Sequence, residues 1–173
     1  MSVRKRTTTP HDPHTDDSTG AITDALLTAS RLLVAISARS IAEVDETITI
    51  PQFRTLVVLS NQGPLNLSTL AGLLEVQPST IGRMVDRLVS ARLIERRANP
   101  ASRREVVITL TRRGHAVVRS VTERRRDEIA AVVSRLQPAD RRGLVRALTA
   151  FTAAGNEPPI RSAHSEPSAA PSA

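Results

Sequence analysis

The sequence of 173 residues lacks cysteine, tryptophan and tyrosine, and Phe53 and Phe151 are its only phenylalanines. The absence of cysteine excludes disulfide bonds, thiolate catalysis, iron–sulfur clusters and thiol redox sensing. The scarcity of aromatic rings argues against the stacking platforms on which many proteins bind single-stranded nucleic acid. The core must therefore consist of leucine, valine, isoleucine and alanine, a composition that suits packed helices.

Lysine is nearly absent as well, because Lys5 is the only lysine among 24 basic residues, and the net charge is +7. The positive charge is concentrated in one part of the chain. Residues 66–110 hold seven arginines against four acids, and residues 111–135 hold seven against three. The planar guanidinium group of arginine can donate two hydrogen bonds at once to a phosphate or to the edge of a base, so this pattern favours a nucleic-acid partner. A basic surface that only keeps the protein in solution is the alternative.

No uninterrupted apolar run reaches the roughly 18 residues that are needed to span a bilayer. The basic residues near the N-terminus are not followed by an apolar stretch, so the sequence shows no secretory signal. These two absences predict a cytoplasmic protein without a membrane partner.

Residues 1–19 and 156–173 are polar or proline-rich, and we expect them to be disordered tails flanking one domain over residues 20–155. The spacing of apolar residues, proline and glycine predicts helices over about 22–46, 51–61, 68–74, 78–92, 111–136 and 138–154. Two runs rich in β-branched residues, 93–97 and 105–110, flank the polar turn 99–104 and predict a β-hairpin.

This order of elements predicts a mainly α fold with a small β-hairpin wing. A winged helix-turn-helix would occupy about residues 50–110, and long helices would occupy about 21–46 and 111–154. The apolar stripes of the long helices are too extensive for so small a module to cover, so we expect them to pair with a second copy of the chain. The residues expected in this dimer interface are Leu26, Leu33, Val132, Leu144, Leu148 and Phe151.

The helix predicted over 78–92 divides into two faces. Its apolar face contains Ile81, Val85 and Leu88. Its polar strip contains Ser79, Thr80, Arg83 and Arg87. Short hydroxyls near the N-terminus and arginines further along suit a helix that inserts its first turns into the DNA major groove. The alternative is an ordinary amphipathic surface helix in which Asp86 pairs with a neighbouring arginine.

The predicted hairpin carries four arginines, which are Arg96, Arg97, Arg103 and Arg104. An arginine at a hairpin tip can reach the narrow minor groove, where negative potential is concentrated. A hairpin kept in solution by its charge is the alternative. Arg112 and Arg113 stand at the start of the next helix, where the helix dipole disfavours cations. A nearby phosphate or solvent screening would offset that cost.

Several short motifs follow one another along the chain and are specific only in combination. They are Gln52-Phe53-Arg54, Leu67-Ser68-Thr69-Leu70-Ala71, the run from Pro78 to Leu88, Leu93-Ile94-Glu95-Arg96-Arg97, the wing from Asn99 to Arg104, and Leu110-Thr111 with Gly114. With these motifs, the stretch from Pro51 to about Phe151 resembles the MarR family of bacterial transcription regulators.

The resemblance implies a homodimer in which the first, fifth and sixth helices interlock, with two winged helices on one pseudo-palindromic DNA duplex. It assigns reading of the major groove to the polar strip and contact with the minor groove to Arg104. It also implies small-molecule effectors, often aromatic acids or drugs, that bind between the dimer helices and the reading domain and weaken DNA binding.

Several positions depart from the family pattern. They are Ser102 where an acid is usual, Gly82 where a hydroxyl residue is common, Gln77 in place of a serine cap, Glu75 where glycine is usual, and Gly72. Gly82 also costs about 1 kcal/mol of helix propensity. These departures bear on DNA affinity and target sequence more than on the fold.

The sequence therefore predicts a double-stranded DNA-binding transcriptional regulator, a repressor released by a small-molecule ligand. We expect no enzyme and no cofactor, because the chain has neither a phosphate-binding glycine loop nor a nucleophile motif. A metal site is not expected either, since His115 is the only histidine outside the tails. The alternative is a dimeric scaffold of the same fold that binds a ligand or protein without recognising a defined operator.

Overall fold

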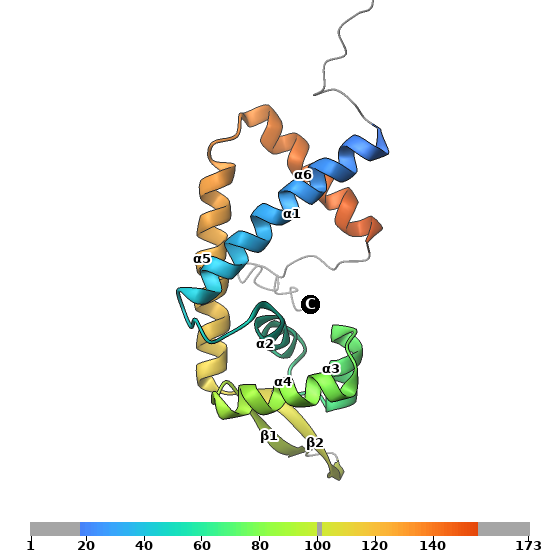
Figure 1. Ribbon diagram of the computed structural model, residues 1–173, viewed down its shortest axis with the longest axis vertical. Helices are drawn as coiled ribbons and strands as arrows, with labels where there is room; N and C mark the ends of the chain where they lie inside the picture. Colours follow the sequence, from blue (N-terminus) through green and yellow to red (C-terminus); the bar gives the residue numbers. More distant parts are fainter. Residues whose placement is uncertain (1–17, 100–101, 156–173) are drawn as a thin grey trace, which may run out of the picture. The chain divides into compact units, whose positions relative to one another are not determined.

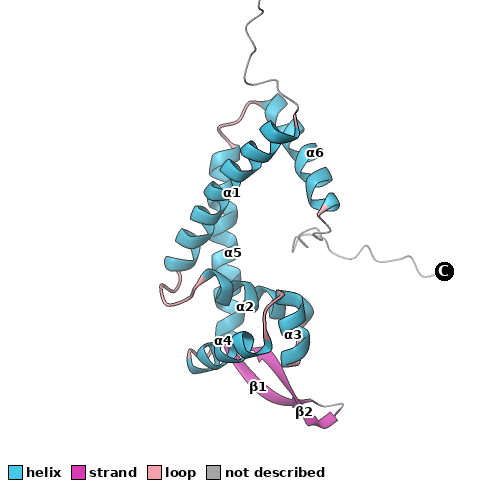
Figure 2. Cartoon of the chain, turned by 45° about the vertical axis from the view of Figure 1, so that its right-hand side comes forward, coloured by secondary structure: helices cyan, strands magenta, loops and turns pink. Residues whose placement is uncertain are grey.

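The computed structural model describes residues 18–99 and 102–155, with only the backbone of residues 102–105. The predicted tails, apart from Ser18 and Thr19, lie outside the described residues. The elements are α1 (Thr19–Ala42), α2 (Ile50–Gln62), α3 (Leu67–Leu74), α4 (Pro78–Ser90), β1 (Ile94–Asn99), β2 (Ser102–Leu110), α5 (Arg112–Val133) and α6 (Pro138–Ala154). The predicted fold class, helices with one antiparallel hairpin, is confirmed (Figures 1 and 2).

The predicted hairpin turn over 99–104 is too long. β1 continues to Asn99 and β2 begins at Ser102, which pairs with Asn99 after an irregularity in register next to Ala98. Arg103 and Arg104 therefore belong to strand β2 and not to the turn. The β-branched pattern predicted only the part of each strand that packs on the core. The residues nearer the turn are polar and do not pack on the core, so they show no apolar alternation.

Three predicted helix ends also need correction. α1 ends at Ala42 instead of Glu46, because the amides of Val44 and Asp45 both bond to the Ile41 carbonyl and close a tight turn. α4 ends at Ser90, and Arg92 then adopts a left-handed conformation with φ of 58°. α5 ends at Val133 and not at Leu136.

Local sequence explains where several helices begin and end. Thr49 and Gln52 form a capping box at the start of α2, with Gln52 Oε1 accepting from the Thr49 amide at 2.8 Å. Asn66 caps α3 by accepting a hydrogen bond from the Thr69 amide at 2.8 Å. α3 ends at Glu75 in the left-handed conformation, with φ of 56°. Glycine adopts this conformation without strain, so the backbone gives a reason for the usual family glycine here.

One hydrophobic core joins the end of α1 to the middle of α5. Its buried members are Ile41, Ile48, Phe53, Leu56, Leu59, Leu70, Ala71, Leu74, Ile81, Val85, Leu88, Leu93, Ile94, Ile108, Leu110, Val117, Val118 and Val121. The backbones of α2, α3 and α4 lie beside the hairpin (Figure 1). A single antiparallel bridge between Leu65 and Ile108, which the sequence did not predict, ties the turn after α2 to β2.

A dense junction connects the hairpin, α4 and α5. The Thr111 hydroxyl lies 2.8 Å from the Arg92 carbonyl oxygen and accepts from the Gly114 amide at 3.0 Å, which confirms Thr111 as the cap of α5. Gly114 is buried against Leu93, the residue before β1, and a Cβ atom built on it would lie 2.1 Å from the Leu93 carbonyl oxygen. No side chain larger than hydrogen fits at this position without moving the backbone of α5 or of Leu93.

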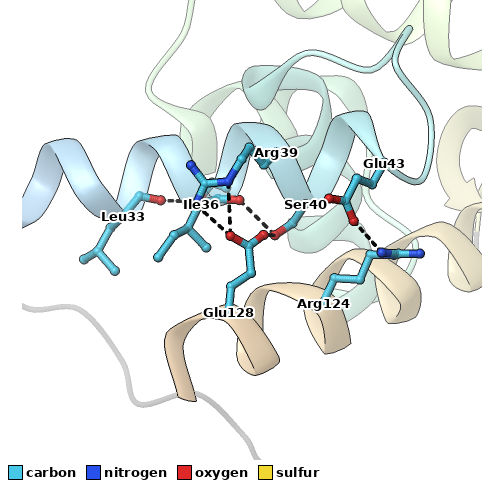
Figure 3. Close-up of polar contacts among 8 residues, drawn as sticks. Leu33, Ile36, Arg39, Ser40, Glu43, Arg124 and Glu128 are labelled. Atoms are coloured by element: carbon cyan, nitrogen blue, oxygen red, sulfur yellow. Dashed lines mark hydrogen bonds and ion pairs between the residues drawn. The ribbon is translucent and has the colours of Figure 1, made fainter. Parts of the chain in front are cut away.

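Polar contacts hold the C-terminal part of α1 against α5 (Figure 3). Glu128 accepts from the Arg39 guanidinium at 2.7 Å, and the Ser40 hydroxyl lies 3.0 Å from its other oxygen. Hydrogen bonds from Arg39 and then Ser40 lower the pKa of Glu128, so the carboxylate is ionised at neutral pH. Arg124 on α5 pairs with Glu43, just past the end of α1.

Most of α1 is exposed to solvent in the part of the chain that the structure describes. Of its residues only Ile36, Ser40 and Ile41 are buried, whereas Leu27 is 57% exposed. Although no uninterrupted apolar run is long enough, the average hydropathy of α1 reaches the level of membrane-crossing helices. Core helices and signal sequences reach the same level, so this finding by itself does not place the chain in a membrane.

The chain divides into two compact units, residues 1–129 and 130–173. In the second unit, the Arg141 side chain donates to the carbonyls of Ser134 at 2.7 Å and Leu136 at 3.0 Å, which satisfies acceptors at the turn before α6. No residue of α6 is buried within this chain.

We expect Gly114→Ala to lower the free energy of unfolding by about 1–3 kcal/mol, because the added methyl overlaps the Leu93 carbonyl. Gly72→Ala in α3 is the matched control, since no atom lies within 4 Å of its Cβ position, and it should stabilise by up to ~1 kcal/mol. Urea denaturation of both variants measures the difference. Equal stability of Gly114→Ala and the parent would contradict the close approach.

Candidate nucleic-acid interface

The two predicted faces of α4 are confirmed by burial. Ile81, Val85 and Leu88 are buried in the core. Ser79, Thr80, Arg83 and Arg87 are all exposed and form one strip, which we call the reading strip. Because the buried face fixes the rotation of α4 about its axis, the strip points away from the core.

The two arginines of the reading strip have no acidic partner within the part of the chain that the structure describes. The start of α4 is also open. Gln77 stands at the N-cap but its side chain makes no capping hydrogen bond, as expected from the departure at this position. Pro78 has no amide hydrogen, and the Thr80 and Ile81 amides bond to the Gln77 carbonyl, so the exposed guanidinium groups of Arg83 and Arg87 are the part of α4 that can attract phosphates.

A shallow groove of about 210 Å³ adjoins the reading strip. Its walls are Thr49, Pro51 and Gln52 from the start of α2, and Thr80, Arg83, Met84 and Arg87 from α4. Met84, one of the lining residues, has its sulfur 2.9 Å from the hydroxyl of the buried Thr55. Sequence reasoning did not identify this groove, because it arises where the ends of two helices meet and neither helix shows it alone.

Two of the four predicted wing arginines are engaged with acids. Arg96 on β1 pairs with Asp86 on α4 at 2.6 Å, which is the local pairing of Asp86 that the alternative interpretation considered. Arg97 pairs with its neighbour Glu95 at 2.5 Å. These exposed pairs are worth at most about 1 kcal/mol, so a DNA phosphate competes with them readily. Arg103 and Arg104 lie on β2, and their side chains are outside the described residues.

The two arginines at the start of α5 differ in their surroundings. Arg113 donates to Asp45 at 3.2 Å, so a carboxylate, and not a phosphate, offsets its unfavourable place in the helix dipole. The Thr47 hydroxyl and amide, together with Arg113, lower the pKa of Asp45 although partial burial raises it. Arg112 is exposed, and no ion pair engages it among the residues described.

The residues predicted for the dimer interface are all solvent-accessible in the single chain. Leu33, Leu144, Leu148 and Phe151 are exposed, with Phe151 at 55%, and Leu26 and Val132 are half-buried. The structure brings none of them into the core. Exposed apolar side chains on two helices leave surface for another molecule to cover.

Comparisons with known proteins agree with this architecture. A model of the MarR family matches residues 48–106. The repressor NicR of Pseudomonas putida is 34% identical over 74 residues, which are 43% of this chain and 47% of NicR. The chain thus matches about half the length of that curated relative.

Two solved structures extend the likeness to the flanking helices. RV1404 from Mycobacterium tuberculosis is 68% identical with a TM-score of 0.77, over 86% of this chain and 100% of that one. BpsR of Bordetella bronchiseptica, whose DNA binding is regulated by 6-hydroxynicotinic acid, is 27% identical with a TM-score of 0.57, over 76% of this chain and 98% of that one. From its fold, its sequence motifs and these relatives, the chain belongs to the MarR family of winged-helix transcription regulators.

Proposed function

We propose that the chain binds double-stranded DNA at a specific operator and represses transcription. The observation that carries this proposal is the exposed reading strip with its two unpaired arginines, held in place by the buried face of α4. NicR is a repressor and BpsR binds DNA, which supports the same role here. These relatives are regulators, which supports a role without catalysis, and a DNA-binding role in a bacterium would be carried out in the cytoplasm.

In this proposal Ser79, Thr80, Arg83 and Arg87 contact base edges and phosphates in the major groove. The wing arginines approach the flanking minor groove, with Arg104 entering it. Arg96 and Arg97 exchange their exposed carboxylate partners for phosphates, and Arg103 adds a further phosphate contact. No cofactor or metal takes part.

We further propose a homodimer in which α1, α5 and α6 of two chains pack together. The support is the apolar surface that each of these helices leaves exposed, including Leu33 on α1 and Leu148 on α6. Two winged helices related by the dimer axis would then match a pseudo-palindromic operator.

A small-molecule effector is the last part of the proposal. The two grooves described on the chain have volumes of about 210 and 150 Å³. Both are smaller than the roughly 300–1,000 Å³ of ordinary ligand pockets. We therefore place the effector between the dimer helices and the reading domain, where assembly of two chains creates a larger cavity. The regulation of BpsR by 6-hydroxynicotinic acid supports an effector of this kind.

Light scattering on the purified full chain at micromolar concentration should give the mass of a dimer, twice 18.7 kDa. Replacing Leu148 by Glu introduces a charge into the proposed interface and should shift the mass toward a monomer. The same substitution at Ala98, exposed on β1, is the control and should leave the dimer intact. A monomeric parent would contradict the proposed assembly.

Titration of the full chain with a labelled duplex from upstream of its own gene should give saturable binding. The affinity should fall by about 10³–10⁵-fold between 50 and 200 mM salt if six to ten phosphate contacts release counterions. A shuffled duplex of the same length is the control. Dimeric protein without preference for any duplex would favour the alternative, a scaffold that binds a ligand or protein without a defined operator.

We expect Arg83→Ala to weaken binding to the operator by about 1–3 kcal/mol and to change binding to shuffled DNA far less. Arg119→Ala on α5 removes the same charge from an exposed arginine outside the reading strip and should alter both affinities slightly. Fluorescence anisotropy at fixed salt measures all four values. An equal loss on operator and shuffled DNA would make Arg83 a phosphate contact only.

A further inference from the structure

Met84 is the only sulfur-containing residue in the part of the chain that the structure describes. The sequence has no cysteine and two methionines, and Met1 lies outside the described residues. A thioether is a soft nucleophile that two-electron oxidants convert to a sulfoxide. In a chain without thiols, oxidants that react with sulfur have few other targets.

The position of Met84 is unusual for a core-filling methionine. Its side chain is half-buried and lines the groove beside the reading strip, between the guanidinium-bearing residues Arg83 and Arg87. Its sulfur lies 2.9 Å from the Thr55 hydroxyl, which also lies 3.0 Å from the Pro51 carbonyl oxygen. The sulfur therefore stands at the contact between α2 and α4, next to a groove that small molecules can enter.

We propose that Met84 is a reversible oxidation site, and that its sulfoxide weakens DNA binding by the reading strip. The oxidant class is the hypohalous acids, and the inference rests on the proposed DNA-binding function. The guanidinium groups of Arg83 and Arg87 give the groove a positive potential, which attracts the hypohalite anion in equilibrium with its acid.

The reaction is a two-electron oxygen transfer. With hypochlorous acid, the thioether sulfur forms a bond to oxygen while the oxygen–chlorine bond breaks. Chlorine leaves as chloride and the proton of the acid passes to water. Sulfur is oxidised by two electrons and chlorine is reduced by two. Methionine sulfoxide reductases return the sulfoxide to the thioether, so the modification is reversible in a cell.

The added oxygen changes the groove chemically. A sulfoxide oxygen is a far stronger hydrogen-bond acceptor than a thioether sulfur. Turned inward, it accepts a hydrogen bond from the Thr55 hydroxyl and adds an oxygen atom at the point where the Met84 side chain of α4 meets Thr55 of α2. Turned outward, it accepts from Arg83 or Arg87 and holds a reading arginine away from DNA. Either position disturbs the reading strip.

The test begins with the reduced full chain and hypochlorous acid added in small molar excess. Peptide mass spectrometry should find a gain of about 16 Da on the Met84 peptide. The oxidised protein should bind the operator about tenfold more weakly, the scale of one lost base-pair contact. Treatment with methionine sulfoxide reductases should restore the affinity.

Met84→Leu is the matched control, because it keeps the volume and cannot form a sulfoxide. It should bind the operator like the reduced parent and keep that affinity after oxidant. Met84→Gln places a polar acceptor in the groove and should bind weakly without oxidant. Equal loss of binding by oxidised Met84→Leu, or an oxidised Met84 with unchanged affinity, would overturn the inference while leaving the proposed function intact.

A reduced chain that binds no duplex would refute the proposed function and, with it, the effect of the sulfoxide on DNA binding, and would leave only the oxidation site itself to be tested. In that case the thermal unfolding of the protein tests whether oxidation of Met84 disturbs the contact between α2 and α4. A melting temperature lowered by oxidant in the parent and unchanged in Met84→Leu supports a sulfoxide that disturbs the α2–α4 contact. Identical melting of the oxidised parent and its reduced form, with the Met84 peptide fully converted, overturns it.

Discussion

The close approach of Gly114 to the Leu93 carbonyl is the constraint on which the placement of α4, the hairpin and α5 depends. This contact packs the first turn of α5 against Leu93, the residue before β1. The Thr111 hydroxyl also hydrogen-bonds to the carbonyl oxygens of Arg92 and Leu93, in the turn after α4. Since β1 follows α4 after a short turn, one junction fixes α4 and the hairpin relative to the first turns of α5. A regulator that must present a helix and a wing to one duplex needs this relation to be rigid.

The second constraint is that the hydrophobic core includes only the end of α1 and the first half of α5. The buried cluster ends at Val121 on α5 and begins at Ile41 on α1, so most of α1 contributes no buried apolar surface. Polar contacts join α1 and the residue that follows it to α5, from Arg39 and Ser40 to Glu128 and from Arg124 to Glu43. Exposed ion pairs give orientation and little stability. The apolar surface that α1 leaves exposed is therefore available to a partner molecule, which is the physical argument for the proposed dimer.

The sequence predicted the features that local chemistry determines. The apolar period of Ile81, Val85 and Leu88 gave the rotation of α4 correctly, and Thr111 was correctly identified as the cap of α5. It did not predict features that depend on distant residues. The turn that shortens α1, the Leu65–Ile108 bridge and the groove beside Met84 each require two segments to meet. The outer parts of the strands were missed for a related reason, since pairing between strands, and not apolar alternation, extends them to Asn99 and Ser102.

The described arginines differ in whether an acid pairs with them, and the amino-acid composition of the chain does not show this difference. Arg39, Arg113 and Arg124 pair with acids on another segment and orient helices. Arg83 and Arg87, on the exposed face of α4, pair with none among the described residues. Unpaired guanidinium groups on a fixed helix face keep their full attraction for phosphate, whereas paired ones must first exchange a carboxylate. The net charge of +7 therefore does not reveal which arginines can bind an anion, because the positions of the acids determine which of the described guanidinium groups remain unpaired.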